Sequence, residues 1–155
     1  MGLENAREHL DQWNRGNDII ILEQSSAAVA LAAAALGVTE QEIAKSISLV
    51  GSNEEVILIV AAGNQKIDNR KFKDEFGIKA KMLAFEDVET KIGHPVGGVC
   101  PFGVKTNVQV FLDRSLEDFE FVYPACGTGN SAIKLTVAEL EVFSGSKKWV
   151  DVTKL

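Results

Sequence analysis

Apolar and polar positions follow two different periods along the chain. Residues 3–13 place apolar side chains at spacings of three and four, which predicts an amphipathic helix. Residues 43–50 (IAKSISLV) alternate with the period of a strand, and residues 56–62 form a continuous apolar run. Because Gly51-Ser52-Asn53 turns the chain between them, we expect a hairpin whose second strand is buried on both faces.

The remaining pattern predicts a mixture of short helices and short strands. Capping residues and terminal glycines place helices at residues 27–36, 39–42, 68–76, 86–91 and 136–145. Apolar and β-branched runs place strands at residues 19–22, 79–83, 108–112, 119–123, 131–135 and, at a sheet edge, 149–152. Ser25-Ser26 is expected to cap the helix at 27–36, whose small side chains predict a largely buried element. Regular strand–helix–strand alternation is absent, so the pattern predicts an α+β domain with a mixed sheet curled into a partial barrel.

Length and composition are those of one ordinary globular domain. The chain has 155 residues, of which 46% are apolar and 25% charged. Since typical domains span about 100–200 residues, we expect a single domain over residues 1–155, in which residues 1–24 form an N-terminal helix and strand. The first 18 residues carry four acids and no apolar stretch, and the longest apolar run has ten residues. We therefore expect neither a secretory signal nor a membrane span, and a cytoplasmic location.

Charge is distributed unevenly. The net charge of −6 argues against a protein that coats nucleic acid through bulk basicity. Residues 66–81, by contrast, hold six basic and three acidic residues. Two interpretations remain open for this basic segment. It forms either a solvated helix face with ion pairs from Arg70 to Asp74 and from Lys71 to Glu75, or a patch that contacts phosphates.

Lys45 is the first candidate for chemistry, because it interrupts a strand of apolar and small residues. An ammonium on an apolar strand face is costly to bury without a partner. One interpretation is a side chain that carries its charged end out to water. The other is a cation held in a cleft, where it binds phosphate or polarises a carbonyl.

Two glycine-rich loops are the next candidates. Residues 97–103 (GGVCPFG) and residues 127–131 (GTGNS) each combine glycines with other turn-forming residues. Such loops can direct successive N–H groups at one anion or oxyanion, although each could equally be a tight connection. Neither contains the lysine and spacing of a P-loop, so nucleoside triphosphate binding is not expected.

The cysteines and histidines give only weak signals. Cys100 and Cys126 form no CxxC pair and are expected to be reduced, partly buried thiols. The two histidines, His9 and His94, lie far apart and lack metal-ligand spacing, so we expect no metal and no cofactor. His94 and Cys100 could be a base and a nucleophile, which keeps a thiol hydrolase open as an alternative.

Three of these features, in this order, resemble a known family. Lys45 on an early strand, GGVCPFG about fifty residues later, and YPACGTGNSAIKL after the segment LDRSL resemble the YbaK/EbsC family. Its members are free-standing aminoacyl-tRNA deacylases related to the editing domain of bacterial prolyl-tRNA synthetase. The resemblance covers residues 25–140, and its most specific parts are Lys45 and the Gly97-x-x-x-Pro101 pattern.

The resemblance implies a fold and a reaction. The fold would be a single compact α+β domain with flanking helices and a mixed, mostly antiparallel, barrel-like sheet. The reaction would be hydrolysis, in trans, of the ester that joins a small wrong amino acid to the 3′ end of tRNA(Pro) or another tRNA. The partner would be the CCA end of an aminoacyl-tRNA, with a synthetase as a further possible partner and neither DNA nor a membrane. The protein would be a monomer or weak dimer.

The resemblance also assigns residues. Lys45 would be the essential lysine, at the CCA-end phosphate or near the aminoacyl group. The backbone N–H groups of Gly97, Gly98 and Val99 would face the scissile carbonyl. Binding residues would be Pro101 in the first loop and, around the amino-acid pocket, Gly127, Thr128, Gly129 and Asn130. A protein of the same fold that binds a tRNA or nucleotide without hydrolysis, or regulates a partner, is the alternative.

Overall fold

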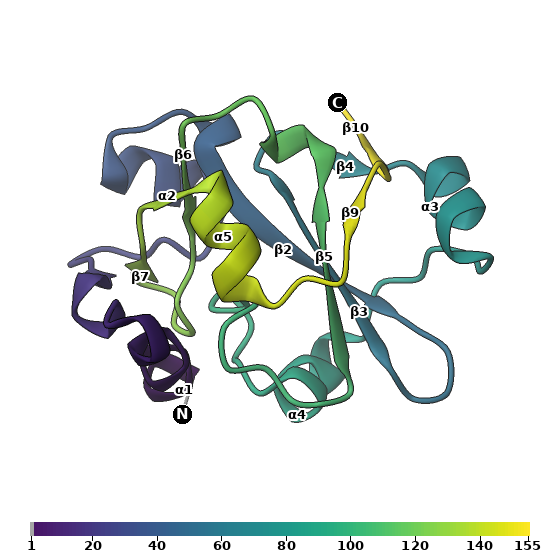
Figure 1. Cartoon of the computed structure of the whole chain (residues 1–155), viewed down its shortest axis with the longest axis horizontal. Coiled ribbons are helices and arrows are strands. Elements are labelled where there is room, and N and C mark those ends of the chain that lie inside the picture. The colour runs from purple at the N-terminus through teal and green to yellow at the C-terminus, as the bar shows by residue number, and fades with distance from the viewer. Residues whose placement is uncertain (1) are drawn as a thin grey trace.

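A six-stranded mixed sheet forms the centre of the protein in a computed structural model that describes residues 2–155 (Figure 1). The strand order is β8-β6-β2-β3-β5-β9. Their bounds are β2 Ile43–Val50, β3 Val56–Ala62, β5 Val108–Asp113, β6 Phe121–Pro124, β8 Leu135–Thr136 and β9 Trp149–Val150. Two small antiparallel sheets add β1 (Ile20–Ile21) with β7 (Ser131–Ala132), and β4 (Lys66–Ile67) with β10 (Thr153–Lys154).

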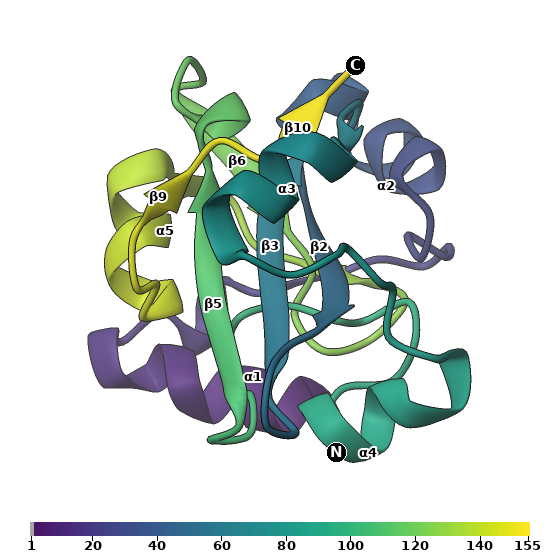
Figure 2. The ribbon, with the colours of Figure 1, turned by 90° about the vertical axis from the view of Figure 1, so that its right-hand side faces the viewer.

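Helices flank the sheet on both faces. Figure 2 shows α3 crossing the near face, with α2 and α5 on either side. The helices are α1 Gly2–Leu10, α2 Val29–Leu36, α3 Asn69–Phe76, α4 Val88–Ile92 and α5 Val137–Ser144. Single turns of 3₁₀ helix cover Asp11–Trp13, Gly16–Asp18, Glu40–Glu42, Phe85–Asp87 and Arg114–Leu116. The two views place the chain termini at opposite ends of the molecule.

The predicted fold class is confirmed. The domain is α+β, its sheet curls into a half-barrel, and four of the seven strand pairings in residues 2–155 are antiparallel. Within the central six-stranded sheet, however, three of the five pairings (β2–β6, β3–β5 and β5–β9) are parallel, so the antiparallel majority depends on the two small sheets and the central sheet is mixed. The expected hairpin is the long β2–β3 pair, and the expected edge strand is β9.

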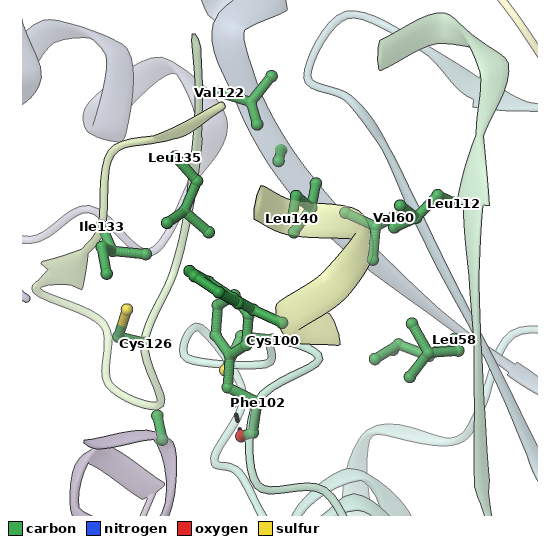
Figure 3. Close-up of a cluster of buried hydrophobic side chains, with 14 of the residues drawn as sticks. Leu58, Val60, Cys100, Phe102, Leu112, Val122, Cys126, Ile133, Leu135 and Leu140 are labelled. Atoms are coloured by element: carbon green, nitrogen blue, oxygen red, sulfur yellow. Dashed lines mark hydrogen bonds between the residues drawn. The ribbon is translucent and has the colours of Figure 1, made fainter. Parts of the chain in front are cut away.

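β3 divides two hydrophobic cores, as its continuous apolar run predicts. Leu58 and Val60 face the larger core under α1, α5 and the glycine loops, which also contains Cys100, Phe102 and Cys126 (Figure 3). Ile57, Ile59 and Ala61 face the smaller core, which Phe72 of α3 covers. Because successive strand side chains point to opposite faces, a strand buried on both sides has no polar positions.

Some local predictions are wrong. Residues 79–83 form only an isolated bridge from Met82 to Leu49, and residues 131–135 are split between β7 and β8. The residue before α2 is Ala28, which makes no side-chain cap, instead of Ser25 or Ser26. Within α2 only Ala32 and Ala33 are buried, so the helix is less covered than its small side chains predict.

Candidate functional site

A cavity of about 500 Å³ opens along the edge of β2. Its walls come from segments far apart in sequence: the residues before and within α2, β2, Met82–Leu83, the first glycine loop, and the chain around β6 and β7. The lining residues are Ser26, Ala27, Ala28, Val29, Ala32, Ile43, Ala44, Lys45, Ser46, Ile47, Ser48, Lys66, Ile67, Met82, Leu83, Val88, Val96, Gly97, Val99, Tyr123, Ala125, Ser131 and Ala132. This volume lies within the range of small-molecule sites, and the wall is mostly apolar with a few polar groups.

Lys45 contributes a half-buried ammonium to this cavity. Its Nζ donates a hydrogen bond to the carbonyl oxygen of Gly63 at 3.1 Å. No carboxylate in residues 2–155 lies within ion-pair distance of it. Burial therefore lowers the pKa of the Lys45 ammonium from its ordinary value. A cation beside a cavity with no internal counter-charge can bind an anionic or carbonyl group of a ligand.

The first glycine loop reaches the cavity in part. Gly97 and Val99 line it, and Gly97 has a φ of +91°, a conformation that favours glycine. Gly98 is buried and its N–H donates to the carbonyl oxygen of Pro95 at 3.0 Å. The N–H of Gly98 is thus already used, so it does not face a ligand as expected. Pro101 is buried behind the loop and does not line the cavity.

The second glycine loop lies behind the cavity wall. None of the residues 127–130 lines the cavity. The carbonyl oxygen of Gly129 instead accepts from the N–H of Ser26 at 2.6 Å, and Asn130 is bonded to Leu22 through both its carbonyl oxygen (2.7 Å) and its amide side chain (3.1 Å). The loop therefore holds the chain that leads into α2, and its contribution to the pocket is indirect.

Thr128 is also committed to internal bonds. Its hydroxyl lies 3.0 Å from Oδ1 of Asn130 and 2.8 Å from Oγ of Ser131. Ser131 itself lines the cavity, as do Ala125 and Ala132 on either side of the loop. The wall expected from Gly127–Asn130 is formed instead by Ser131, the last residue of the GTGNS segment, and by Ala125 and Ala132, whose small side chains gave no signal in the sequence.

His94 and Cys100 do not form a nucleophilic pair at the cavity. Both are fully buried, and the Cys100 Sγ lies 3.5 Å from Nε2 of His94, which also contacts the carbonyl oxygen of Phe102 at 2.6 Å. Burial raises the pKa of the Cys100 thiol to about 12 and lowers the pKa of His94. A neutral thiol in the core cannot attack a bound ester, which removes the structural support for a thiol hydrolase.

The basic segment at residues 66–81 is only partly paired. Neither of the two expected ion pairs forms in residues 2–155: Lys71 pairs with Asp151 and Glu75 with Lys148, and Arg70 and Asp74 do not pair with one another. Lys66 lines the cavity next to Ile67. Positive charge from this segment therefore reaches the cavity itself.

No group of three or more His, Cys, Asp or Glu side chains in the described part of the chain could hold a metal ion.

Ser46 is a site residue that the sequence patterns did not indicate. It lines the cavity beside Lys45, and its buried hydroxyl has no hydrogen-bond partner among residues 2–155. Buried polar groups in folded proteins are almost always paired. The sequence does show a serine that alternates with apolar residues on a strand. This pattern is also common on ordinary half-exposed strands, so it does not indicate a site by itself.

Comparison with known proteins places these features in a family. Residues 23–143 match the family model described as the aminoacyl-tRNA editing domain. The uncharacterized protein YwhH of Bacillus subtilis is 53% identical over 99% of this chain and 98% of its own length. EbsC of Enterococcus faecalis, a candidate Cys-tRNA(Pro)/Cys-tRNA(Cys) deacylase by its name, is 28% identical over 66% of this chain and 63% of its own. A solved structure described as a candidate trans-editing enzyme for prolyl-tRNA synthetase superposes with a TM-score of 0.87 at 25% identity, covering 99% of this chain and 98% of that one.

No helix in residues 2–155 is both long and apolar enough to cross a membrane.

Proposed function

This chain belongs to the aminoacyl-tRNA editing domain family, and from that premise we propose that it is a deacylase of mischarged tRNA. The reaction is hydrolysis of the ester between an amino acid and the terminal ribose of the tRNA. Water adds to the ester carbonyl, the bond to the ribose oxygen breaks, and the products are the free amino acid and tRNA with a free ribose hydroxyl. We propose that the protein acts in trans on the CCA end.

One observation carries the proposal: Lys45 and two residues of the first glycine loop, Gly97 and Val99, line the same cavity, although the lysine and the loop were singled out independently in the sequence. Lys45 supplies a cation, and we propose that the backbone N–H groups of Gly97 and Val99 supply further donors, since the N–H of Gly98 is already bonded to Pro95. Both kinds of group are suited to a phosphate or to the negative charge that develops on a carbonyl oxygen during hydrolysis. Lys66, the first residue of the basic segment, adds a second cation to the cavity wall.

Positioning and charge stabilisation are the main contributions expected from this site. No Asp, Glu or His of the described residues 2–155 lines the cavity, so this part of the chain offers no carboxylate or imidazole there as a general base. An activated ester needs less assistance than an amide, and holding water and ester together accounts for a large share of catalysis in such sites. The ribose hydroxyl next to the ester is a further group that can assist proton transfer.

The substrate we propose is a small amino acid on tRNA(Pro) or on another tRNA. The cavity wall is built from alanine, serine and valine side chains together with larger apolar ones, which suits a small apolar or hydroxylated side chain. A double-sieve logic then applies: the cavity admits small residues and excludes the larger cognate one.

A panel of mischarged tRNAs tests this proposal. Purified protein is incubated with Ala-tRNA(Pro), Cys-tRNA(Pro) and seryl and threonyl species, and ester hydrolysis is followed. We expect at least one species to be hydrolysed well above its spontaneous rate, and Lys45→Ala to lower kcat/KM about 100-fold or more without unfolding the protein. Lys147→Ala, an exposed lysine outside the cavity, is the matched control.

Two results would contradict it. Undiminished hydrolysis by Lys45→Ala would remove Lys45 from the site. Absence of hydrolysis across the panel, together with measurable binding of uncharged tRNA, would favour the non-catalytic binding protein.

A further inference from the structure

The outer edge of β2 is open around Ser46. In the β2–β3 hairpin, backbone groups alternate between the partner strand and the opposite edge. The N–H of Val50 donates to Lys81 and the carbonyl oxygen of Ser48 accepts from Leu83, both on the side away from β3. Ser46 lies two residues before Ser48 on the same strand, so its backbone groups point to the same edge. The N–H and carbonyl of Ser46 therefore also point away from β3, towards the cavity that it lines.

The opening is centred on Ser46 and also includes the N–H of Ser48, which has no hydrogen-bond partner in residues 2–155. On its N-terminal side, β6 covers the edge through the pairing of Ala44 with Pro124. On its C-terminal side, Leu83 covers Ser48 with a hydrogen bond of 3.0 Å. Between them, no hydrogen bond in the described chain satisfies the N–H, the carbonyl or the hydroxyl of Ser46. An unpaired strand edge of this kind is a ready template for another chain.

We propose that the main chain of Ser46 binds the aminoacyl group as a single residue of antiparallel strand. The two residues of a hydrogen-bonded antiparallel pair exchange both of their backbone bonds. An aminoacyl ester carries the two groups required: its α-ammonium donates to the Ser46 carbonyl, and its ester carbonyl accepts from the Ser46 N–H. This inference rests on the proposed function and names the contact that fixes the substrate in it.

The charges of the cavity agree with this arrangement. Among residues 2–155, Lys45 and Lys66 are the lysines that line it and no carboxylate does, so a bound α-ammonium must be recognised by neutral oxygens. The side chains of Lys45 and Ser46 leave β2 on opposite faces, because strand side chains alternate. The substrate ammonium, bonded at the edge, is therefore not placed directly beneath the Lys45 ammonium.

The same contact contributes to the reaction. As water adds, the ester carbonyl oxygen becomes negatively charged, and a donor already bonded to it becomes more favourable. The N–H of Gly98 is not available for this role because it is bonded to Pro95. The N–H of Ser46, which has no partner in residues 2–155, is free to supply this donor.

Paired substrates test the inference on the wild-type protein. Alanyl-tRNA is compared with propionyl-tRNA, and seryl-tRNA with 3-hydroxypropionyl-tRNA, which lack only the α-amino group. Each enzymatic rate is divided by the spontaneous rate, because the amino group also activates the ester. We expect removal of the amino group to lower this rate enhancement about tenfold or more, as a lost hydrogen bond to a charged group does.

Two variants separate the main chain from the side chain. Ser46→Pro deletes the N–H on the open edge, where no ladder bond is lost, and Lys45 before it is already extended. We expect Ser46→Pro to lose the rate enhancement and the preference for the amino group. Ser46→Ala, which removes only the hydroxyl, should keep that preference.

The outcomes are distinguishable. Equal rate enhancement of amino and deamino substrates by the wild-type protein overturns the inference, as does a folded Ser46→Pro variant with undiminished activity. If Ser46→Pro fails to fold by circular dichroism, the wild-type substrate pairs decide the question alone. If the wild-type protein hydrolyses none of the aminoacyl-tRNAs, the proposed function fails, and the inference that rests on it fails too.

Discussion

The backbone of Gly98 packs directly against that of Gly127, so that a β-carbon on Gly98 would lie 2.5 Å from the carbonyl carbon of Gly127. Real β-carbons essentially never approach other atoms so closely. This contact joins the two glycine loops through two residues that are 29 positions apart in sequence. The first loop lines the cavity and the second holds the chain leading into α2, so their junction fixes two walls relative to one another.

Gly98→Ala is therefore expected to destabilise the protein and to impair hydrolysis. Overpacking of this kind costs about 1–3 kcal/mol, and each kcal/mol lowers the melting temperature by roughly 2–4 °C in a domain of this size. Thermal unfolding and the rate on the best panel substrate measure the two effects. Gly129→Ala is the matched control for stability, because its β-carbon would make an ordinary 3.5 Å contact with Ala27. An unchanged melting temperature for Gly98→Ala would contradict the close approach.

Replacing Lys45 by methionine should stabilise the fold while it removes activity. Burial lowers the pKa of the Lys45 ammonium in the folded state, whereas the unfolded chain has the ordinary value of 10.5. The folded state therefore binds the proton less well, and the charged lysine opposes folding at pH 7. Lys45→Met should melt a few degrees higher at most, because the side chain is partly solvated.

The difference in stability between Lys45→Met and the wild type should depend on pH. The stability gap between Lys45→Met and the wild type should shrink as the pH rises through the folded-state pKa towards 10.5, where both proteins carry a neutral side chain. Melting curves from pH 7 to pH 10 measure it. A gap that widens with pH would show that the ammonium is stabilised in the fold.

Cys100 should be dispensable for hydrolysis. Its thiol is fully buried with a pKa of about 12, so it is neither ionised nor reachable. We expect Cys100→Ser and Cys100→Ala to keep the rate constant within a few-fold, with some loss of stability from the altered core. Iodoacetamide should leave the activity of the native protein unchanged. Inactivation by Cys100→Ser without any change in thermal unfolding would restore the thiol mechanism.

Binding of tRNA should depend only weakly on salt. The net charge is −6, and the cations that line the cavity are Lys45 and Lys66. Each phosphate contact to a single strand adds about 0.7 to the slope of log Kd against log salt, so a slope below about 3 is expected. Lys66→Gln should reduce the slope by about 0.7, whereas Lys147→Gln should not. A slope near that of a protein with many phosphate contacts would contradict a site limited to the tRNA end.

The fold was predictable where a periodic pattern ran for several residues. The β2–β3 hairpin, α1 and α3 with its Asp68 cap follow directly from alternation and capping signals. Residues 131–135 could not be divided into β7 and β8 from sequence, because β7 pairs with the distant β1 whereas β8 pairs with the nearby β6. Such pairing is decided by tertiary contacts, which override local preference.

The site was predictable by residue type more than by role. Lys45 and Gly97 line the cavity, as their unusual contexts indicated. Asn130 and Thr128 have equally suggestive side chains, but Thr128 is bonded within the loop and the amide of Asn130 is bonded to Leu22. Ser46, by contrast, lines the cavity but was not predicted as a site residue. Its unpaired hydroxyl and the open strand edge depend on which segments cover β2, and no local sequence pattern shows this.

The cavity is assembled from segments far apart in sequence, and this affects the rate at which it forms during folding. The β2–β3 hairpin brings together residues close in sequence, whereas the remaining walls need the chain before α2 to meet the loop at Gly129 across about a hundred residues. Contacts of such separation form slowly because their loop entropy must be overcome first. Refolding protein should therefore regain secondary structure before it regains ligand binding, and fragments that lack either end of this contact should fold locally without forming a functional cavity.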